Sequence, residues 1–127
     1  MPNTGQILIA DDADSLLLPV TDMLRLEGYE CNYVPDTNTV IEILKCIKFN
    51  LLIADINTVG SRELEAIKEL SDYTNELSII LVADIPLSEV QIQSMKPLVT
   101  ACLRKPLSFE ELLKYVRCSI KGKLIGT

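Results

Sequence analysis

The chain has 127 residues, a formal net charge of −6, four cysteines, and neither histidine nor tryptophan. Its 48% apolar and 24% charged residues are typical of one soluble globular domain with a sizeable core. The absence of histidine excludes histidine-based catalysis and histidine-ligated zinc sites. The acidic balance argues against nucleic acid or an anionic membrane as the primary partner. We expect a cytoplasmic protein, because the sequence shows no signal peptide and no apolar run of roughly 20 residues.

The cysteines lie far apart in the sequence and form no C-x-x-C pair. They are Cys31, Cys46, Cys102 and Cys118. This spacing favours reduced thiols in the core of a cytosolic protein over a disulfide framework or a metal site. We therefore predict four free, buried thiols.

Five apolar runs, each of which predicts a strand, alternate with five stretches of helical periodicity. The strands are expected over residues 7–10, 31–34, 51–54, 78–83 and 99–103. The helices are expected over residues 16–26, 40–47, 62–70, 88–96 and 109–120. Pro19 lies early in the first helical stretch, so that helix either begins late or is disturbed there. Gly28 supplies its C-terminal stop. Capping boxes that begin at Thr39 and at Ser108 predict the starts of two further helices.

Strands that are apolar throughout are buried on both faces, which is typical of a parallel sheet covered by helices. We therefore predict an α/β fold with a five-stranded parallel sheet. Right-handed crossovers place the C-terminal ends of all strands along one edge, where open α/β sheets bind their ligands. The residues at the strand ends there are Asp11 and Asp12, then Asp55, Ala83 and Asp84, and Lys105.

The acidic residues at this edge suggest metal-assisted phosphoryl chemistry. Three carboxylates close together repel one another unless a cation joins them. Oxygen ligands without histidine favour a hard ion, and Mg²⁺ fits best. A carboxylate beside Mg²⁺ and the Lys105 ammonium can attack a phosphoryl donor and form an acyl phosphate. Each residue alone has a structural explanation, since an aspartate after a strand often caps a helix or forms a turn. Only the combined placement is specific.

This combination resembles the receiver domain of two-component response regulators, and the resemblance covers essentially the whole chain. The matching segments are ILIADD at 7–12, GYEC at 28–31, LLIAD at 51–55 and LRKP at 103–106. The resemblance implies a flavodoxin-like, doubly wound (βα)5 sandwich. It also implies a single domain over residues 1–127, in which residues 121–127 form a tail or the start of a linker.

The resemblance further implies a role for each residue of the site. Asp55 would be the phosphoacceptor, and Lys105 would contact the phosphate. Asp11 and Asp12 would bind Mg²⁺ with Asp55 and the backbone carbonyl of Asn57. The donor would be a phosphohistidine on a sensor histidine kinase or phosphotransfer protein, which agrees with the lack of histidine in this chain. The domain would regulate a downstream protein or output domain, with no enzymatic activity beyond its own phosphorylation and dephosphorylation, and a homodimer could form through residues 88–120.

The sequence departs from the family pattern where a receiver reports its phosphorylation. Ala83 replaces the usual Ser or Thr, and Cys102 replaces the aromatic switch residue. Thr58-Val59 stands in place of Met-Pro, and Leu98 in place of a small residue. We interpret Ala83 and Cys102 as ordinary core residues. The acidic residues and the lysine of the family pattern are all present, whereas the hydroxyl at position 83 and the aromatic ring at position 102 are absent.

Two other functions stay open. The missing switch residues are also compatible with a pseudo-receiver, a protein-interaction module that does not use phosphorylation. Residues 53–59 resemble the segment that carries the Asp-x-Asp-x-Thr loop of haloacid-dehalogenase-type phosphatases. That motif needs a second aspartate where this chain has Asn57, normally follows the first strand, and comes with a cap domain for which there is no room.

Overall fold

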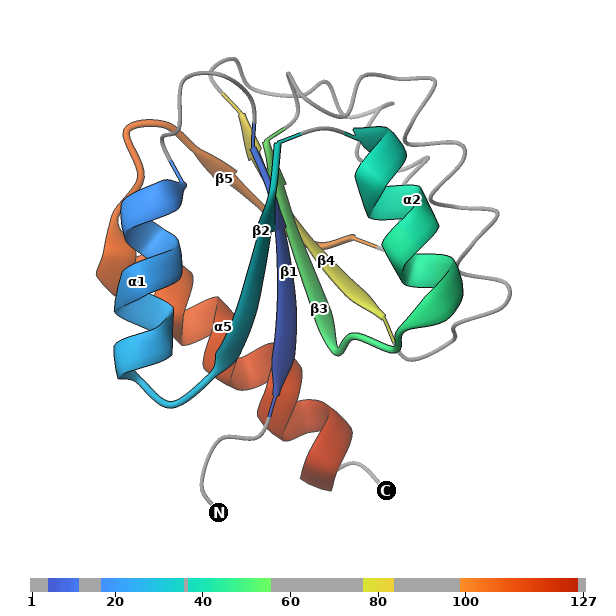
Figure 1. The fold of residues 1–127 in the computed structure, drawn as a ribbon. Helices are drawn as coiled ribbons and strands as arrows, with labels where there is room; N and C mark the ends of the chain where they lie inside the picture. Colours follow the sequence, from blue (N-terminus) through green and yellow to red (C-terminus); the bar gives the residue numbers. More distant parts are fainter. Residues whose placement is uncertain (1–4, 12–16, 36, 56–76, 84–98, 126–127) are drawn as a thin grey trace.

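The computed structural model describes residues 5–11, 17–35, 37–55, 77–83 and 99–125 (Figure 1). These residues form strands β1 (Gln6–Ala10), β2 (Glu30–Val34), β3 (Leu51–Asp55), β4 (Ser78–Ala83) and β5 (Val99–Arg104), and helices α1 (Leu18–Leu26), α2 (Thr37–Cys46) and α5 (Phe109–Ile125). All five strand predictions are confirmed to within one residue at each end. The helices expected over 62–70 and 88–96 lie outside the described residues.

The strands form one parallel sheet in the order β2-β1-β3-β4-β5. The chain passes from β1 outward to β2 and then returns to the other side of β1 to form β3. The order of strands therefore reverses between β1 and β3, and open α/β sheets bind ligands beyond such a switch point. Asp11 directly follows β1 and Asp55 ends β3, so the two carboxylates flank this point.

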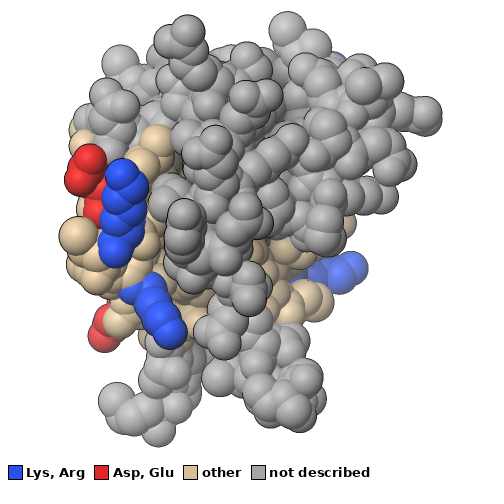
Figure 2. Space-filling view, turned by 90° about the vertical axis from the view of Figure 1, so that its right-hand side faces the viewer, with Lys and Arg blue, Asp and Glu red and all other residues tan. Residues whose placement is uncertain are grey.

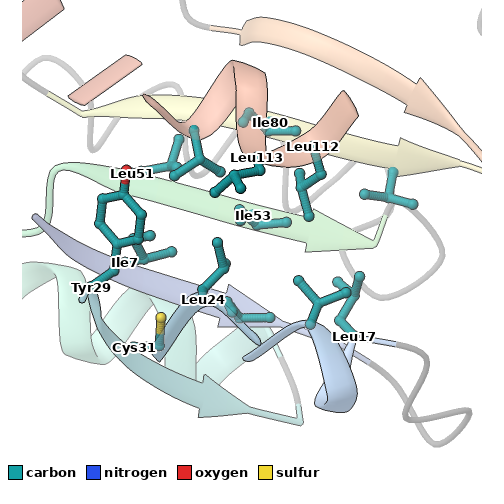
Figure 3. Packing of buried hydrophobic residues seen from close by; sticks show 14 of the residues in the cluster. Ile7, Leu17, Leu24, Tyr29, Cys31, Leu51, Ile53, Ile80, Leu112 and Leu113 are labelled. Atoms are coloured by element: carbon teal, nitrogen blue, oxygen red, sulfur yellow. The ribbon is translucent and has the colours of Figure 1, made fainter. Parts of the chain in front are cut away.

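Helices cover both faces of the sheet (Figure 1), as the uniformly apolar strands predict. On one face, α1 and α5 contribute Leu24 and Leu112 to a cluster that contains Ile7, Ile9 and Ile53 of the sheet (Figure 3). We call this face the α1/α5 face.

On the opposite face, Val40 and Leu44 of α2 belong to a second cluster with Leu8 and Leu52. The two faces alternate along each strand because successive side chains point to opposite sides. Leu8 thus faces α2 while its neighbours Ile7 and Ile9 face α1 and α5.

The first helix begins late, one of the two outcomes that Pro19 allowed. α1 begins at Leu18, and Pro19 lies in its first turn, where a missing backbone N–H breaks no helical hydrogen bond. Gly28 has a φ of 102°, which glycine adopts without strain, and it follows the end of the helix as predicted.

One of the two predicted capping boxes is wrong. α2 begins at Thr37, so Thr39 lies inside the helix and does not cap it. The Thr-x-x-Glu pattern also occurs within helices, so it does not by itself locate the first residue of a helix. The second box is supported, because the Ser108 Oγ accepts a hydrogen bond of 3.3 Å from the backbone N–H of Glu111.

The prediction of buried thiols holds for Cys31 alone. Burial raises the pKa of Cys31 to about 11. Cys46, Cys102 and Cys118 are exposed, although all four are free thiols. Cys46 ends α2, Cys118 lies on the outer side of α5, and Cys102 lies on the edge strand β5. An apolar residue type therefore does not ensure burial at a helix end or on an edge strand.

None of the described helices is long and apolar enough to cross a membrane. Figure 2 views the molecule from the side that lies on the right in Figure 1. Acidic and basic side chains of the described residues are interspersed along one edge of this view. Among these residues, this side therefore presents no patch of a single charge sign.

We expect the middle strand to carry much of the stability. Leu52 of β3 is fully buried, so Leu52→Ala should lower the free energy of unfolding by about 3 kcal/mol. Leu26 is 86% exposed, and Leu26→Ala should change the free energy of unfolding by less than about 0.5 kcal/mol. Urea denaturation measures both values. Equal losses in the two variants would contradict the described packing.

Candidate functional site

The alternation of side chains along the strands brings the polar residues of the site together. Asp11, the residue after β1, continues the row of Ile7 and Ile9, which faces α1 and α5. In β3, Asp55 follows Ile53 in the same way. Lys105 continues the corresponding row of β5. All three therefore lie on the α1/α5 face, at the edge where the strands end.

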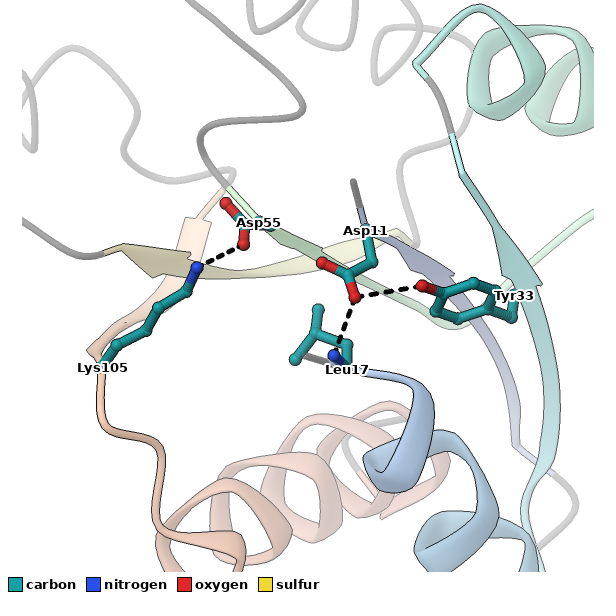
Figure 4. A network of polar contacts seen from close by, with 5 residues as sticks. All are labelled: Asp11, Leu17, Tyr33, Asp55 and Lys105. Atoms are coloured by element: carbon teal, nitrogen blue, oxygen red, sulfur yellow. Dashed lines mark hydrogen bonds and ion pairs between the residues drawn. The ribbon is translucent and has the colours of Figure 1, made fainter. Parts of the chain in front are cut away.

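Asp55 and Lys105 form a buried ion pair (Figure 4). The Lys105 Nζ lies 2.5 Å from the Asp55 Oδ2, and the two side chains are 10% and 0% exposed. A carboxylate without access to water is costly unless a charge and hydrogen bonds compensate it. The lysine supplies that compensation. Its own backbone N–H donates to the carbonyl of Ala83 at 2.9 Å, which fixes its place beside β4.

Asp11 is stabilised by hydrogen bonds. It is fully buried, and its Oδ2 accepts the backbone N–H of Leu17 at 2.8 Å and the hydroxyl of Tyr33 at 3.0 Å (Figure 4). Its backbone N–H also donates to the carbonyl of Val34 at 3.1 Å. One aspartate therefore connects the ends of β1 and β2 with the start of α1.

Tyr33 belongs to the site although no sequence motif points to it. The residue pairs with Ile9 in the parallel register of β1 and β2, and its partly buried ring packs against the cluster of the α1/α5 face. Asp11 lies two residues beyond Ile9, within reach of the Tyr33 hydroxyl. The alternation of side chains along each strand predicts that Asp11 and Tyr33 lie on the same face of the sheet. Only the register of β1 and β2 shows that they lie at the same height along the strands.

The remaining predicted site residues have mixed outcomes. Asp12 and Asn57 lie outside the described residues. Ala83 is buried, as expected of a core residue. Cys102 is exposed, which corrects its interpretation as a core residue, and partial burial raises the pKa of its thiol. Cys102 lies on the edge strand β5, and its side chain points away from the core face that its neighbours Ala101 and Leu103 line.

The donor set fits a hard divalent cation. Asp11 and Asp55 offer carboxylate oxygens, flank the switch point and are both fully buried. Magnesium is commonly bound through one or two carboxylates and water. The described residues contain no group of three or more acidic, cysteine or histidine side chains that could hold a metal ion, and Asp12, the third predicted acidic ligand, lies outside them.

A family model described as the response regulator receiver domain matches residues 7–117. The chain belongs to this family. The matched region of the receiver contains Asp11, Tyr33, Asp55 and Lys105. Membership also argues against the phosphatase alternative, as does the position of Asp55 at the end of β3, since the phosphatase motif normally follows the first strand.

Solved receiver structures share the fold. A CheY-like receiver domain protein from Methanospirillum hungatei JF-1 has a TM-score of 0.85 and 21% identity, covering 98% of this chain and 100% of that one. A receiver domain protein from Clostridium thermocellum has a TM-score of 0.82 and 20% identity, covering 97% and 99%. These likenesses and the strand order confirm the predicted flavodoxin-like architecture.

The sequence is also similar to the regulatory protein AtoC of Escherichia coli (strain K12). The two are 21% identical over 112 residues, which cover 88% of this chain and 24% of AtoC. This chain therefore spans about a quarter of the length of that relative.

Removing one partner of the buried ion pair should cost more stability than removing one partner of an exposed pair. Lys105→Met leaves the Asp55 carboxylate buried without its counter-charge and should cost about 3 kcal/mol of stability at neutral pH. Adding Asp55→Asn should recover much of this loss, because the uncompensated charge is then gone.

Arg117→Met provides the matched control. The Arg117–Glu27 pair has a distance of 3.0 Å, but its side chains are 54% and 37% exposed, so the loss should be about 0.5 kcal/mol. Urea denaturation of the unaltered protein, Lys105→Met, Asp55→Asn and their double variant gives the coupling energy of the buried pair, and Arg117→Met is measured beside them. Additive effects of the Lys105 and Asp55 substitutions would contradict a stabilising pair.

Proposed function

We propose that this receiver accepts a phosphoryl group on Asp55, in the presence of Mg²⁺, from a phosphohistidine on a sensor kinase or phosphotransfer protein. Phosphorylation then regulates a partner or an output domain. The observation that carries the proposal is the buried Asp55 carboxylate, held by Lys105 at the switch point and accompanied by the buried Asp11. Membership of the receiver family supports it.

In the proposed reaction, a carboxylate oxygen of Asp55 attacks the phosphorus of the donor. The phosphorus–nitrogen bond to the partner's histidine breaks, and an acyl phosphate bond to Asp55 forms. Lys105 loses its carboxylate partner as that oxygen becomes esterified, and its ammonium is then placed to bind an oxygen of the phosphoryl group. When bound, Mg²⁺ would neutralise charge on the transferring group, with Asp11, Asp12, Asp55 and the Asn57 carbonyl as its protein ligands.

The pseudo-receiver alternative is not favoured. A module that no longer used phosphorylation would have no need to keep a fully buried aspartate beside a lysine, since a buried ion pair seldom adds stability over apolar residues of similar size. The kinase, the output partner, a homodimer through residues 88–120 and a cytoplasmic location stay predictions.

The nucleophile can be tested directly. Incubation with acetyl phosphate and Mg²⁺ should add one phosphoryl group to the intact protein, and Asp55→Asn should abolish this addition because the amide is not a comparable nucleophile. Asp22→Asn is the control, because the Asp22 side chain is 73% exposed on α1. Intact-mass spectrometry reads the result. Unchanged labelling of Asp55→Asn, or no labelling of the unaltered protein, would favour the pseudo-receiver.

We expect phosphorylation to be weakly coupled to rearrangement beyond the site. Ala83 is buried and has only a methyl group where related domains place a hydroxyl that bonds the phosphoryl group. A hydrogen bond to a charged group contributes about 1.5–3 kcal/mol, so its loss reduces the population shift roughly tenfold to a hundredfold. Cys102 is also too small to fill the space that an aromatic switch residue would occupy.

NMR spectra with and without beryllofluoride, a mimic of the phosphoryl group, test this coupling. Chemical-shift changes should be large near Asp55 and Lys105 and fade across residues 88–103. Ala83→Thr, combined with Cys102→Tyr, should extend them by restoring the hydroxyl and the ring. Large changes across residues 88–103 in the unaltered protein would show that another route carries the signal.

A further inference from the structure

We propose that Tyr33 is a positioning residue of the cation site. Its hydroxyl, together with the backbone N–H of Leu17, holds the Asp11 carboxylate in the orientation that binds Mg²⁺. This inference rests on the proposed function, because it concerns the same cation. It adds a residue from the edge strand β2 to a site otherwise built from the ends of β1, β3 and β5.

The geometry shows two donors from different elements on a single oxygen. Leu17 precedes α1 and donates at 2.8 Å, and Tyr33 lies on β2 and donates at 3.0 Å, both to the Asp11 Oδ2. In Figure 4 the other oxygen, Oδ1, points toward the side on which Asp55 and Lys105 lie. The carboxylate therefore presents Oδ1 to the region between the two buried acids.

Two fixed donors restrict a torsion that is otherwise soft. The terminal torsion of an aspartate has a broad preference, so a single hydrogen bond leaves the carboxylate plane free to rotate. A second donor from a separate strand defines that plane. Hydrogen bonds from such outer residues commonly orient the ligands of metal sites, and their removal weakens metal binding.

Tyr33 is well placed for this role because packing already holds its ring. The ring is partly buried against the apolar cluster of the α1/α5 face. Phenylalanine would keep that packing and remove only the hydroxyl, so Tyr33→Phe isolates the hydrogen bond. Without it, the Asp11 carboxylate can turn away from the orientation that Mg²⁺ requires.

The test compares Mg²⁺ affinity in three proteins by calorimetric titration. Tyr33→Phe should weaken binding about tenfold, while Tyr115→Phe should stay within about twofold of the unaltered protein. Tyr115 is a suitable control because it also has a partly buried ring in the same apolar cluster, on α5. Asp11→Asn gives the reference for loss of the ligand itself. Thermal unfolding with and without Mg²⁺ separates the apo stability from the stabilisation that binding adds.

A second measurement follows Mg²⁺ binding by tyrosine fluorescence. Because the chain has no tryptophan, tyrosine emission reports the environment of its four tyrosines. Mg²⁺ should change this emission in the unaltered protein and in Tyr115→Phe, at the concentrations that calorimetry gives for binding. Tyr33→Phe should lose that change.

The outcomes separate this inference from the function on which it rests. If Tyr33→Phe bound Mg²⁺ as tightly as the unaltered protein, with or without a loss of stability in the absence of Mg²⁺, the role of Tyr33 would be structural only. Tighter binding would show that the hydroxyl competes with the cation for Asp11. Either result overturns the inference while phosphorylation of Asp55 can still proceed. If the unaltered protein bound no Mg²⁺, the proposed cation site would fail, and the role of Tyr33 with it.

Discussion

The ion pair between Asp55 and Lys105 is the interaction on which the site depends. A carboxylate with no exposed surface at the end of the middle strand is tolerated only with a counter-charge nearby. β3 and β5 are not neighbours, since β4 lies between them, so the counter-charge must come from a long side chain. Lys105 meets this requirement because its backbone is bonded to Ala83 at the end of β4.

The two buried acids are stabilised by different means, which matters for the chemistry. Asp55 is balanced by a charge, whereas Asp11 is held by neutral donors from Leu17 and Tyr33. The two acids and Lys105 together carry a formal charge of −1, and Asp12 follows Asp11 in the sequence. A divalent cation matches this excess of charge, and the oxygen-only donors favour a hard ion.

Much of this arrangement could be predicted, for reasons that also explain the failures. Continuous apolar runs identify buried parallel strands, and the polar residue after each run identifies the functional edge, so Asp11, Asp55 and Lys105 could be found. Tyr33 could not, because its place beside Asp11 depends on the register of β1 and β2, which residue types do not encode. Cys102 was misassigned because burial depends on a strand's place in the sheet, and β5 is an edge strand.

The residues that hold the two acids come from opposite edges of the sheet. Asp11 is held by residues of β2 and of the segment before α1, and Asp55 is held by the residue that follows β5. β2 and β5 are the two edge strands, so each half of the site is tied to a different edge. In the proposed reaction, phosphorylation would change the partners of Asp55, and a cation bound by both acids would pass that change on to Asp11 and the residues that hold it. Such a link toward α1 and β2 would not depend on the hydroxyl that is absent at Ala83.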